Sequence, residues 1–260
     1  MENLTYLNKD EIKTYLKNKI EVEVYSTLDS TSTYARQISS EKDNDFLIAC
    51  ESQSCGRGRR HKSFISKKGS IYFTIGLKYN KNIDIDYITI ISCIACVNVL
   101  EELNIDLKIK WVNDLFYKNK KCGGILSELI RDENNNPQCL LIGIGINLME
   151  VALDDSIEQI ACALPLNKDK ANYIIGNIVD QIYKLLSSPI RVIMDKYRSR
   201  SLLLNQKIDF MIDDKPYKGI VRDFSDKGYL VIESEDGIKI LKSGEVSISS
   251  KYISQKLQGK

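Results

Sequence analysis

Three strand-like segments lie in the stretch KIKWVNDLFYKNKKCGGILSELIRDENNNPQCLLIGIGINL, residues 108–148. They cover residues 108–117, 124–130 and 140–148, and each is rich in apolar or β-branched side chains. Strong turn sequences separate them, KNK at residues 118–120 and NNNP at residues 134–137. The stretch therefore predicts consecutive strands of a sheet.

The residues before this stretch alternate between helical and strand-like patterns. Residues 9–19 predict a short amphipathic helix, and Val22, Val24 and Leu28 alternate as in a first strand. The cluster DSTST at residues 29–33 contains helix-capping residues ahead of a helix at residues 34–38. Apolar runs at residues 46–50 and 70–77 predict buried strands, and residues 87–103 predict a helix. The chain is thus of mixed α and β class.

Two further helices and a change of pattern follow the stretch. Apolar residues at helical spacing predict a helix over residues 174–186, and Ser188 and Pro189 look like the cap and first turn of another that reaches Arg200. From Ile208 onward, short alternating segments are separated by turns, which predicts a small antiparallel barrel. We therefore expect an N-terminal extension over residues 1–20, a large domain over 21–202 and a small domain over 203–260.

Composition narrows the class of protein. The 37 Lys and Arg residues nearly balance 35 Asp and Glu residues, so a protein that mainly coats nucleic acid is not indicated. No window reaches the roughly 18 apolar residues of a membrane helix, and no signal peptide is visible, so we expect a cytoplasmic protein. Seven scattered cysteines suit reduced thiols, and Cys93 and Cys96 suit a packed helix better than a metal site.

A basic, glycine-containing loop lies between two predicted strands. Arg57, Arg59, Arg60 and Lys62 place four cations in six residues, and the glycines at positions 56 and 58 allow close backbone approach to an anion. The loop is not a Walker A motif, because the required glycine, lysine and hydroxyl spacing is absent. Taken alone, such a basic run is more typical of a solvated surface loop or a nucleic-acid patch than of a site for a small anion.

Together with other motifs, this loop resembles the catalytic core of biotin protein ligases. The matching elements, in chain order, are DST at residues 29–31, Gln53, GRGRR at 56–60, KWVND at 110–114, KCGGILSE at 121–128, GIGIN at 143–147 and SGEVSI at 243–248. The resemblance covers nearly all of residues 22–250. It implies an α+β fold, in which a mixed or antiparallel sheet flanked by helices, as in class II synthetases, precedes an SH3-like barrel.

The resemblance also implies a set of biotin-binding residues. They are Ser30, Thr31, Ser32, Gln53, Gly56, Arg57, Gly58, Arg59, Lys121, Gly124, Gly143 and Gly145. The hydroxyls would hydrogen-bond the ureido group, although plain helix capping is the alternative for Ser30 and Thr31. For the two glycines on the last strand, the alternative is a bulge.

Catalytic and nucleotide-binding residues are implied in the same way. Lys121 is our first choice for the essential lysine, with Arg57 and Arg59 as further catalytic residues, because a cation offsets repulsion between a carboxylate and a phosphate. Lys120 would be equivalent to Lys121 if this were only a turn lysine. ATP would contact Arg59, Arg60, Lys62, Phe64, Lys110, Asn113, Asp114 and Asn147. Asn113 and Asp114 would also serve Mg²⁺.

The resemblance implies an ATP-dependent ligase that forms biotinyl-5′-AMP and transfers biotin to a lysine of a biotin carboxyl carrier protein. Val112, Phe64 and Ser32 replace the family's usual proline, tryptophan and asparagine, and His61, expected at the surface, replaces a glycine. We expect a monomer or homodimer that is not a membrane protein. We also expect that it is not a repressor, because only about twenty residues precede the first core strand and a helix-turn-helix domain needs about sixty. The alternatives are a lipoate ligase or octanoyltransferase, and a non-catalytic biotin sensor or nucleic-acid-binding module.

Overall fold

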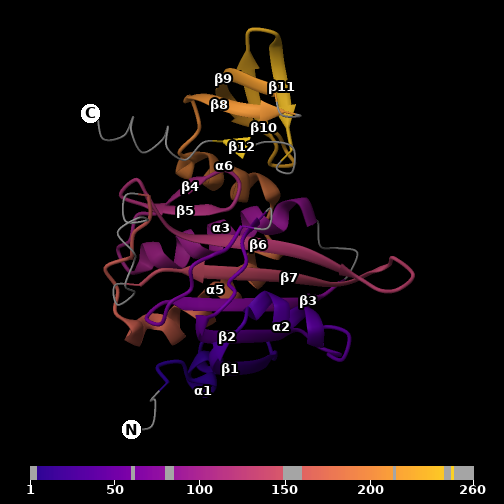
Figure 1. Ribbon diagram of the computed structural model, residues 1–260, viewed down its shortest axis with the longest axis vertical. Coiled ribbons are helices and arrows are strands. Elements are labelled where there is room, and N and C mark those ends of the chain that lie inside the picture. The colour runs from indigo at the N-terminus through magenta and orange to yellow at the C-terminus, as the bar shows by residue number, and fades with distance from the viewer. Residues whose placement is uncertain are drawn as a thin grey trace.

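The computed structural model describes residues 5–59, 62–79, 85–148, 160–212, 215–242 and 247–248. Figure 1 shows a large sheet with helices on both of its faces and a smaller sheet above it, toward the C-terminus. Arg60 and His61, and residues 243–246 of the SGEVSI motif, lie outside the described residues.

The large sheet has seven strands in the order β1-β2-β3-β7-β6-β5-β4. Their bounds are β1 Glu21–Leu28, β2 Phe46–Gln53, β3 Ile71–Lys78, β4 Lys108–Lys110, β5 Asp114–Tyr117, β6 Lys120–Arg131 and β7 Pro137–Ile146. The pairing of β1 with β2 is parallel, and all other pairings in the sheet are antiparallel. Strands β6 and β7, which carry the glycines of the KCGGILSE and GIGIN motifs, are therefore neighbours near the middle of the sheet.

The prediction of one strand over residues 108–117 was wrong. Strands β4 and β5 form an antiparallel pair, with Lys110 opposite Asp114, and the chain turns at residues 111–113. Asn113 stabilises this turn through two hydrogen bonds with the backbone of Ile125. Its side-chain Nδ2 donates to the Ile125 carbonyl at 2.7 Å, and its backbone carbonyl accepts from the Ile125 amide at 3.0 Å. An amide side chain that bonds to backbone offers the chain an alternative to the regular ladder.

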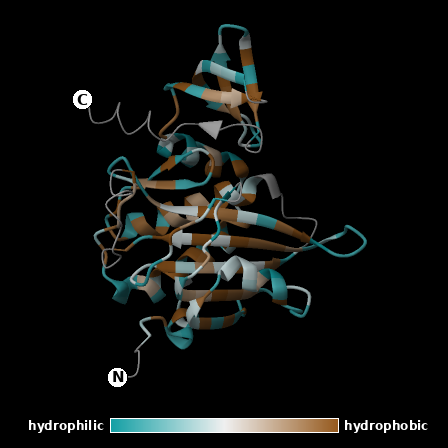
Figure 2. Cartoon of the chain, viewed as in Figure 1, coloured by the Kyte–Doolittle hydropathy of each residue, from teal (hydrophilic) through white to brown (hydrophobic). Residues whose placement is uncertain are grey.

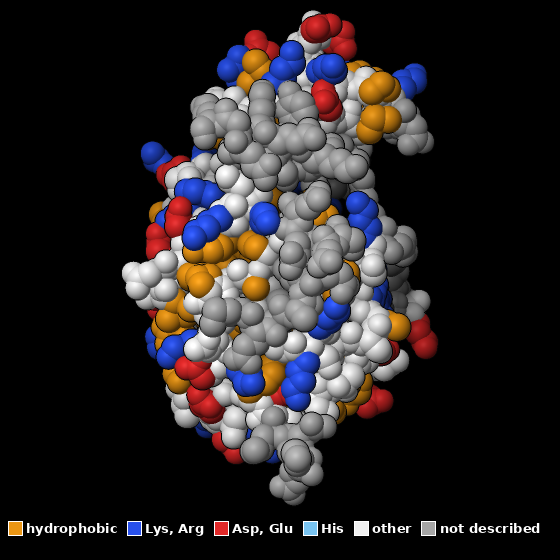
Figure 3. All heavy atoms as spheres, turned by 60° about the vertical axis from the view of Figure 1, so that its left-hand side comes forward, with side chains coloured by type: hydrophobic (Ala, Val, Ile, Leu, Met, Phe, Trp, Pro, Cys, Tyr) orange, Lys and Arg blue, Asp and Glu red, His pale blue; other side chains and the backbone are white. Residues whose placement is uncertain are grey.

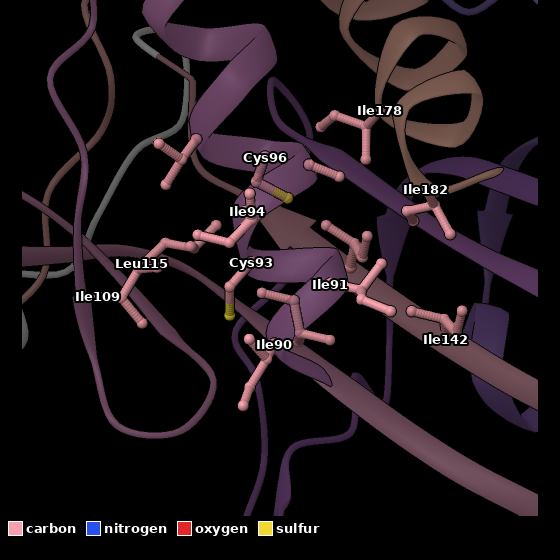
Figure 4. Packing of buried hydrophobic residues seen from close by; sticks show 14 of the residues in the cluster. Ile90, Ile91, Cys93, Ile94, Cys96, Ile109, Leu115, Ile142, Ile178 and Ile182 are labelled. Carbon is pink, nitrogen blue, oxygen red and sulfur yellow. The ribbon is translucent and has the colours of Figure 1, made fainter. Parts of the chain in front are cut away.

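The main core lies between one face of the sheet and the helices α1 Lys9–Thr14, α3 Ile85–Glu102, α5 Ala171–Leu186 and α6 Ile190–Arg200. Helix α3 is buried along most of its length, as expected of a helix that is apolar all round. Figure 4 shows its side chains packed among Ile142 of β7 and Ile178 and Ile182 of α5. Cys93 and Cys96 are buried in this packing, so the prediction of a packed helix is confirmed, and all seven cysteines are free thiols.

Helix α2, Thr31–Ile38, covers the opposite face of the sheet. Strand β2 separates the two faces by alternation: Leu47 and Ala49 belong to the main core, whereas Phe46 and Ile48 pack with Ala35 of α2 in a second cluster. Both faces of β2 are apolar at residues 46–50, because each face is covered. Figure 2 shows hydrophobic and hydrophilic bands along other parts of the strands. The face under α2 therefore has its own small core, and it also carries the site described below.

The C-terminal sheet has five strands in the order β11-β10-β9-β8-β12, all antiparallel. Their bounds are β8 Lys207–Ile212, β9 Lys215–Phe224, β10 Leu230–Ser234, β11 Gly237–Leu241 and β12 Ser247–Ile248. The indole Nε1 of Trp111 donates to the Gly228 carbonyl at 2.9 Å and joins this sheet to the β4–β5 turn. The predicted α+β architecture with a small C-terminal β domain is confirmed, while the proposed domain boundaries stay a prediction.

Two local details complete the fold. A 3-10 helix, η2 Lys168–Lys170, precedes α5, and α6 begins at Ile190 with Pro189 rather than Ser188 at the N-cap. Ser188 instead donates its hydroxyl to the Lys184 carbonyl at the end of α5, so the predicted cap at Ser188 was wrong. Within the described residues, no helix is both long and apolar enough to cross a membrane.

Candidate active site

A cavity of about 340 Å³ lies on the α2 face of the large sheet. It is lined by three groups of predicted site residues: Ser30, Thr31, Ser32 and Gln53; Arg57, Gly58, Arg59, Lys62 and Phe64; and Lys110, Asn113, Asp114, Lys121, Gly124, Gly143 and Gly145. Predicted residues as far apart in the chain as Ser30 and Gly145 therefore share one cavity.

Two glycines of β7 make room for the elements above the sheet. A Cβ atom at Gly143 would lie 2.5 Å from the Ser32 Oγ, and one at Gly145 would lie 2.6 Å from the Phe64 ring. Strand β7 keeps a regular register with β3 across both glycines, so the alternative of a bulged strand does not apply there. These positions are glycines because α2 and the segment after the basic loop approach the sheet closely.

A hydrogen-bonded network of hydroxyl and amide groups forms one end of the cavity. Thr74 of β3 donates to the Thr31 hydroxyl at 2.9 Å and lies 3.2 Å from the Ser32 hydroxyl. Gln53 accepts from the Thr31 backbone amide at 2.8 Å and donates to Ser66 at 2.7 Å. The network fixes several donors and acceptors at the sheet surface, as a small polar ligand group requires.

Ser30 and Thr31 serve as helix start and cavity wall at once. Ser30 is the N-cap of α2, and its hydroxyl accepts a long hydrogen bond of 3.4 Å from the Thr33 amide. Both side chains are also buried against the cavity. The capping alternative is therefore correct for Ser30, and it does not exclude contact with a ligand.

The described part of the basic loop lines the cavity with residues 57–59 and 62. Two backbone hydrogen bonds close it, from the Gly58 amide to the Lys62 carbonyl at 2.7 Å and from the Phe64 amide to the Gly56 carbonyl at 2.8 Å. Arg59 donates to the Asn113 side chain at 3.3 Å, whereas Arg57 pairs with Glu128 of β6. The guanidinium of Arg57 thus has a protein carboxylate as its partner.

A cluster of cations surrounds Asp114 at the other end of the cavity. Lys121 donates to the Asp114 carboxylate at 2.6 Å and lies 5.9 Å from the centre of the Phe64 ring. Lys110 is only 4% exposed, and burial, together with nearby Lys121, lowers the pKa of its ammonium to about 8, although Asp114 opposes the shift. The excess of positive charge suits a multiply charged anion.

The cluster is a local feature of a molecule of mixed charge. Figure 3 shows Lys and Arg side chains interspersed with Asp and Glu on the face in view, as the nearly balanced composition predicts. No group of three or more His, Cys, Asp or Glu side chains that could hold a metal ion occurs among the residues that the structure describes. An Mg²⁺ ion here would depend on phosphate oxygens for most of its ligands.

Some predicted residues do not line the cavity, and some lining residues were not predicted. Gly56 lies beside the cavity, where a Cβ atom would come within 2.2 Å of the Phe64 carbonyl, and Asn147 donates its amide to the Cys162 carbonyl. Lys121 lines the cavity and Lys120 does not. The lining residues that were missed are Ser63, Trp111, Ile125, Leu126, Ile144 and Ile160.

Thr74 was missed as well, although its place directly opposite Gly143 in the ladder between β3 and β7 puts it in the hydroxyl network. Trp111 lies inside the KWVND motif, so its position could have been suspected. Nothing in the sequence signals Ile160, which is brought to the site through its backbone contact with Lys121.

Comparisons with known proteins agree with this arrangement. Residues 24–147 match the Biotin/lipoate A/B protein ligase family, and residues 203–249 match the Biotin protein ligase C terminal domain. The Bifunctional ligase/repressor BirA of Salmonella typhimurium is 28% identical over 260 residues, which covers 96% of this chain and 80% of the relative. The Biotin--[acetyl-CoA-carboxylase] ligase of Mycobacterium tuberculosis is 21% identical, with 82% of each chain covered.

Solved structures show the same fold. The biotin protein ligase from Aquifex aeolicus in complex with biotin and ATP superimposes with a TM-score of 0.75 at 23% identity, over 88% of this chain and 98% of that one. The biotin acetyl coenzyme A carboxylase synthetase from Helicobacter pylori gives a TM-score of 0.63 at 19% identity, over 85% of this chain and all of that one. With its catalytic and C-terminal domains both matched, the chain belongs to the biotin protein ligase family of enzymes.

Proposed function

We propose that this enzyme forms biotinyl-5′-AMP from biotin and ATP and then transfers biotin to a lysine of a biotin carboxyl carrier domain. The observation that carries the proposal is the position of Lys121. It lines the same cavity as the hydroxyl network and donates to the Asp114 carboxylate at the cationic end. One end of the cavity suits a neutral polar ring and the other suits phosphate. A molecule with a ureido ring at one end and a carboxylate that reacts with ATP at the other matches both.

In the first step, a biotin carboxylate oxygen attacks the α-phosphorus of ATP, the bond to the β-phosphate oxygen breaks, and pyrophosphate leaves. Lys121 reduces the repulsion between the two anions and stabilises the charge that develops in the transition state. Arg59, Lys62 and Lys110 line the phosphate end and bind the triphosphate, and Phe64 offers a ring face to the adenine. We propose no catalytic role for a cysteine or histidine.

In the second step, the neutral ε-amine of the carrier lysine attacks the carbonyl carbon of the mixed anhydride. The bond from this carbon to the phosphate oxygen breaks, AMP leaves, and the amine gives its proton to solvent. Lys121 remains beside the leaving phosphate and stabilises its negative charge. Mg²⁺, bound with ATP, would neutralise phosphate charge, and Asn113 and Asp114 would offer it one amide oxygen and one carboxylate.

The family resemblance and the names of relatives support this choice of substrates. The Aquifex aeolicus structure is described as holding biotin and ATP, and the Mycobacterium tuberculosis relative is named for acetyl-CoA carboxylase. The proposed roles of Arg60 and Asn147 in ATP binding stay predictions. So does the expectation that this polypeptide does not act as a repressor, which biotinyl-adenylate-dependent binding to an operator DNA would contradict.

The decisive experiment is carrier labelling. The purified protein is incubated with radiolabelled biotin, MgATP and a biotin carboxyl carrier domain, with the same domain carrying Arg in place of its acceptor lysine as the control. We expect label on the first carrier only, and only when ATP is present. No label, while a reference ligase labels the same carrier, would refute the proposal, and pyrophosphate exchange stimulated by lipoate but not by biotin would favour a lipoate ligase.

A further inference from the structure

One carboxylate on β6 joins three elements around the basic loop. Glu128 accepts two parallel hydrogen bonds from the Arg57 guanidinium, at 2.9 and 3.1 Å, and one from Arg36 of α2 at 2.7 Å. Its side chain is 17% exposed, so the pair with Arg57 is partly shielded from solvent. Bidentate pairs of this kind are the strongest and most geometrically defined of the ion pairs in proteins.

Arg57 and Arg59 of the loop contact different kinds of side chain. Arg59 donates to the neutral side-chain amide of Asn113 at 3.3 Å, a contact that a phosphate oxygen can replace. Arg57 meets a full carboxylate through two bonds, so a ligand gains little by competing for it. The contact between Arg57 and Glu128 is therefore an attachment of the loop that a bound ligand need not displace.

Glu128 lies outside the chemistry itself. It does not line the cavity but lines an adjoining groove, and Arg57 lines both. Along β6, Glu128 is four residues beyond Gly124, which is about 13 Å of extended strand. The carboxylate is thus far from Lys121 and beyond Leu126, which pairs with Gly143 at the hydroxyl end of the cavity.

We propose that Glu128 is a positioning residue that holds Arg57, keeps the loop at residues 56–58 closed over bound biotin, and thereby slows release of biotinyl-adenylate. The inference rests on the proposed function, because it concerns the same intermediate. Ordering the loop before the ligand arrives removes part of the entropy cost of binding. Glu128 should consequently affect how long the intermediate is retained more than how fast it forms.

The test is a comparison of Glu128→Gln with Glu233→Gln. The second variant makes the same chemical change at a more exposed glutamate, which pairs with Arg222 in the C-terminal sheet and does not line the cavity. Each protein is loaded with radiolabelled biotin and MgATP and then chased with excess unlabelled biotin, and retained label is counted over time. We expect release from Glu128→Gln to be about five- to tenfold faster than from the parent. Release from Glu233→Gln should be unchanged.

A kinetic comparison separates positioning from a merely structural role. In biotin-dependent pyrophosphate exchange, Glu128→Gln should raise the KM for biotin and leave kcat within about twofold. In a double-mutant cycle, Arg57→Gln combined with Glu128→Gln should release label no faster than the faster single variant, because both remove one contact. If Glu128→Gln does not fold, Arg57→Gln alone, which leaves Glu128 paired with Arg36, should show the faster release.

Equal release from the parent and Glu128→Gln would overturn the inference. So would a loss of kcat with unchanged release, which would place Glu128 in the chemistry, or additive effects in the cycle. These outcomes are distinct from failure of the proposed function, in which the parent itself retains no label after loading with biotin and MgATP.

Discussion

Replacing Lys121 by alanine should abolish most of the adenylate formation while the fold is kept. The side chain of Lys121 is 35% exposed, and its partner Asp114 is 24% exposed. An ion pair with this degree of exposure contributes only about 0–1 kcal/mol to the free energy of unfolding. The backbone of Lys121, which bonds to Ile160 and Cys162, is unaffected by the change. Loss of activity would therefore not reflect unfolding.

The expected effect on the reaction is larger. Loss of one group that stabilises charge in a transition state typically costs about 10²- to 10³-fold in kcat, or about 2.7–4 kcal/mol. The loss in transition-state stabilisation should thus exceed the loss in folding stability several times. Asp114 is not left in a neutral environment by the change, because Lys110 remains within its electrostatic reach.

Three measurements decide the matter. Biotin-dependent exchange of pyrophosphate into ATP reports adenylate formation, denaturant unfolding reports stability, and the fluorescence of Trp111, the single tryptophan and a lining residue, reports ligand binding. Lys120→Ala is the matched control, since Lys120 is adjacent but does not line the cavity. The assignment would be refuted if Lys121→Ala kept more than about a third of the exchange rate, or if Lys120→Ala lost as much.

Three further changes test other parts of the site. The pKa of Lys110 is lowered to about 8, so its side chain loses its charge above this pH. ATP binding should therefore weaken about tenfold between pH 7 and pH 9 in the parent protein, whereas the Lys110→Met variant should not show this pH dependence. Over about pH 8–10.5 the unfolded chain binds more protons at this lysine, so its contribution to the free energy of unfolding should rise with pH, and a flat profile would contradict the shift. Trp111→Phe removes the hydrogen bond from the indole to the Gly228 carbonyl. The free energy of unfolding, measured with denaturant, should fall by about 1–3 kcal/mol, and the KM for ATP should rise. An unchanged KM would show that the contact with the C-terminal sheet does not affect the site. Gly145→Ala should displace Phe64, 2.6 Å from the new Cβ, and lower activity in an enzyme that still shows a native circular dichroism spectrum.

Much of the fold could be predicted because its signals are local. The apolar runs that became β2 and β3 are bounded by polar loops, and the helical spacing over residues 174–186 follows one face of α5. The apolar pattern over residues 108–117 wrongly predicted one continuous strand. The turn at residues 111–113 depends on hydrogen bonds from Asn113 to Ile125 and from Trp111 to Gly228. Both contacts connect residues that are not neighbours in the chain.

The candidate site was predictable where a motif marked it and not where a contact across the sheet made it. Lys121, Asp114 and the basic loop could be named from their motifs. Thr74 lies outside these motifs, and Glu128 ends the motif at residues 121–128 without any sign of its role. Each acts through partners on another element, Thr31 and Ser32 for Thr74 and Arg57 for Glu128.

By itself, the sequence determined the class of fold, the order of the motifs and the positions of the glycines and cations. Alternation along a strand indicates which residues share a face, but it does not say which strand lies alongside or in what register. Only the tertiary structure decided that Ser32 lies over Gly143, that Phe64 lies over Gly145, and that Arg57 is held by Glu128. These contacts depend on sheet order and register, which arise from the packing of the whole chain.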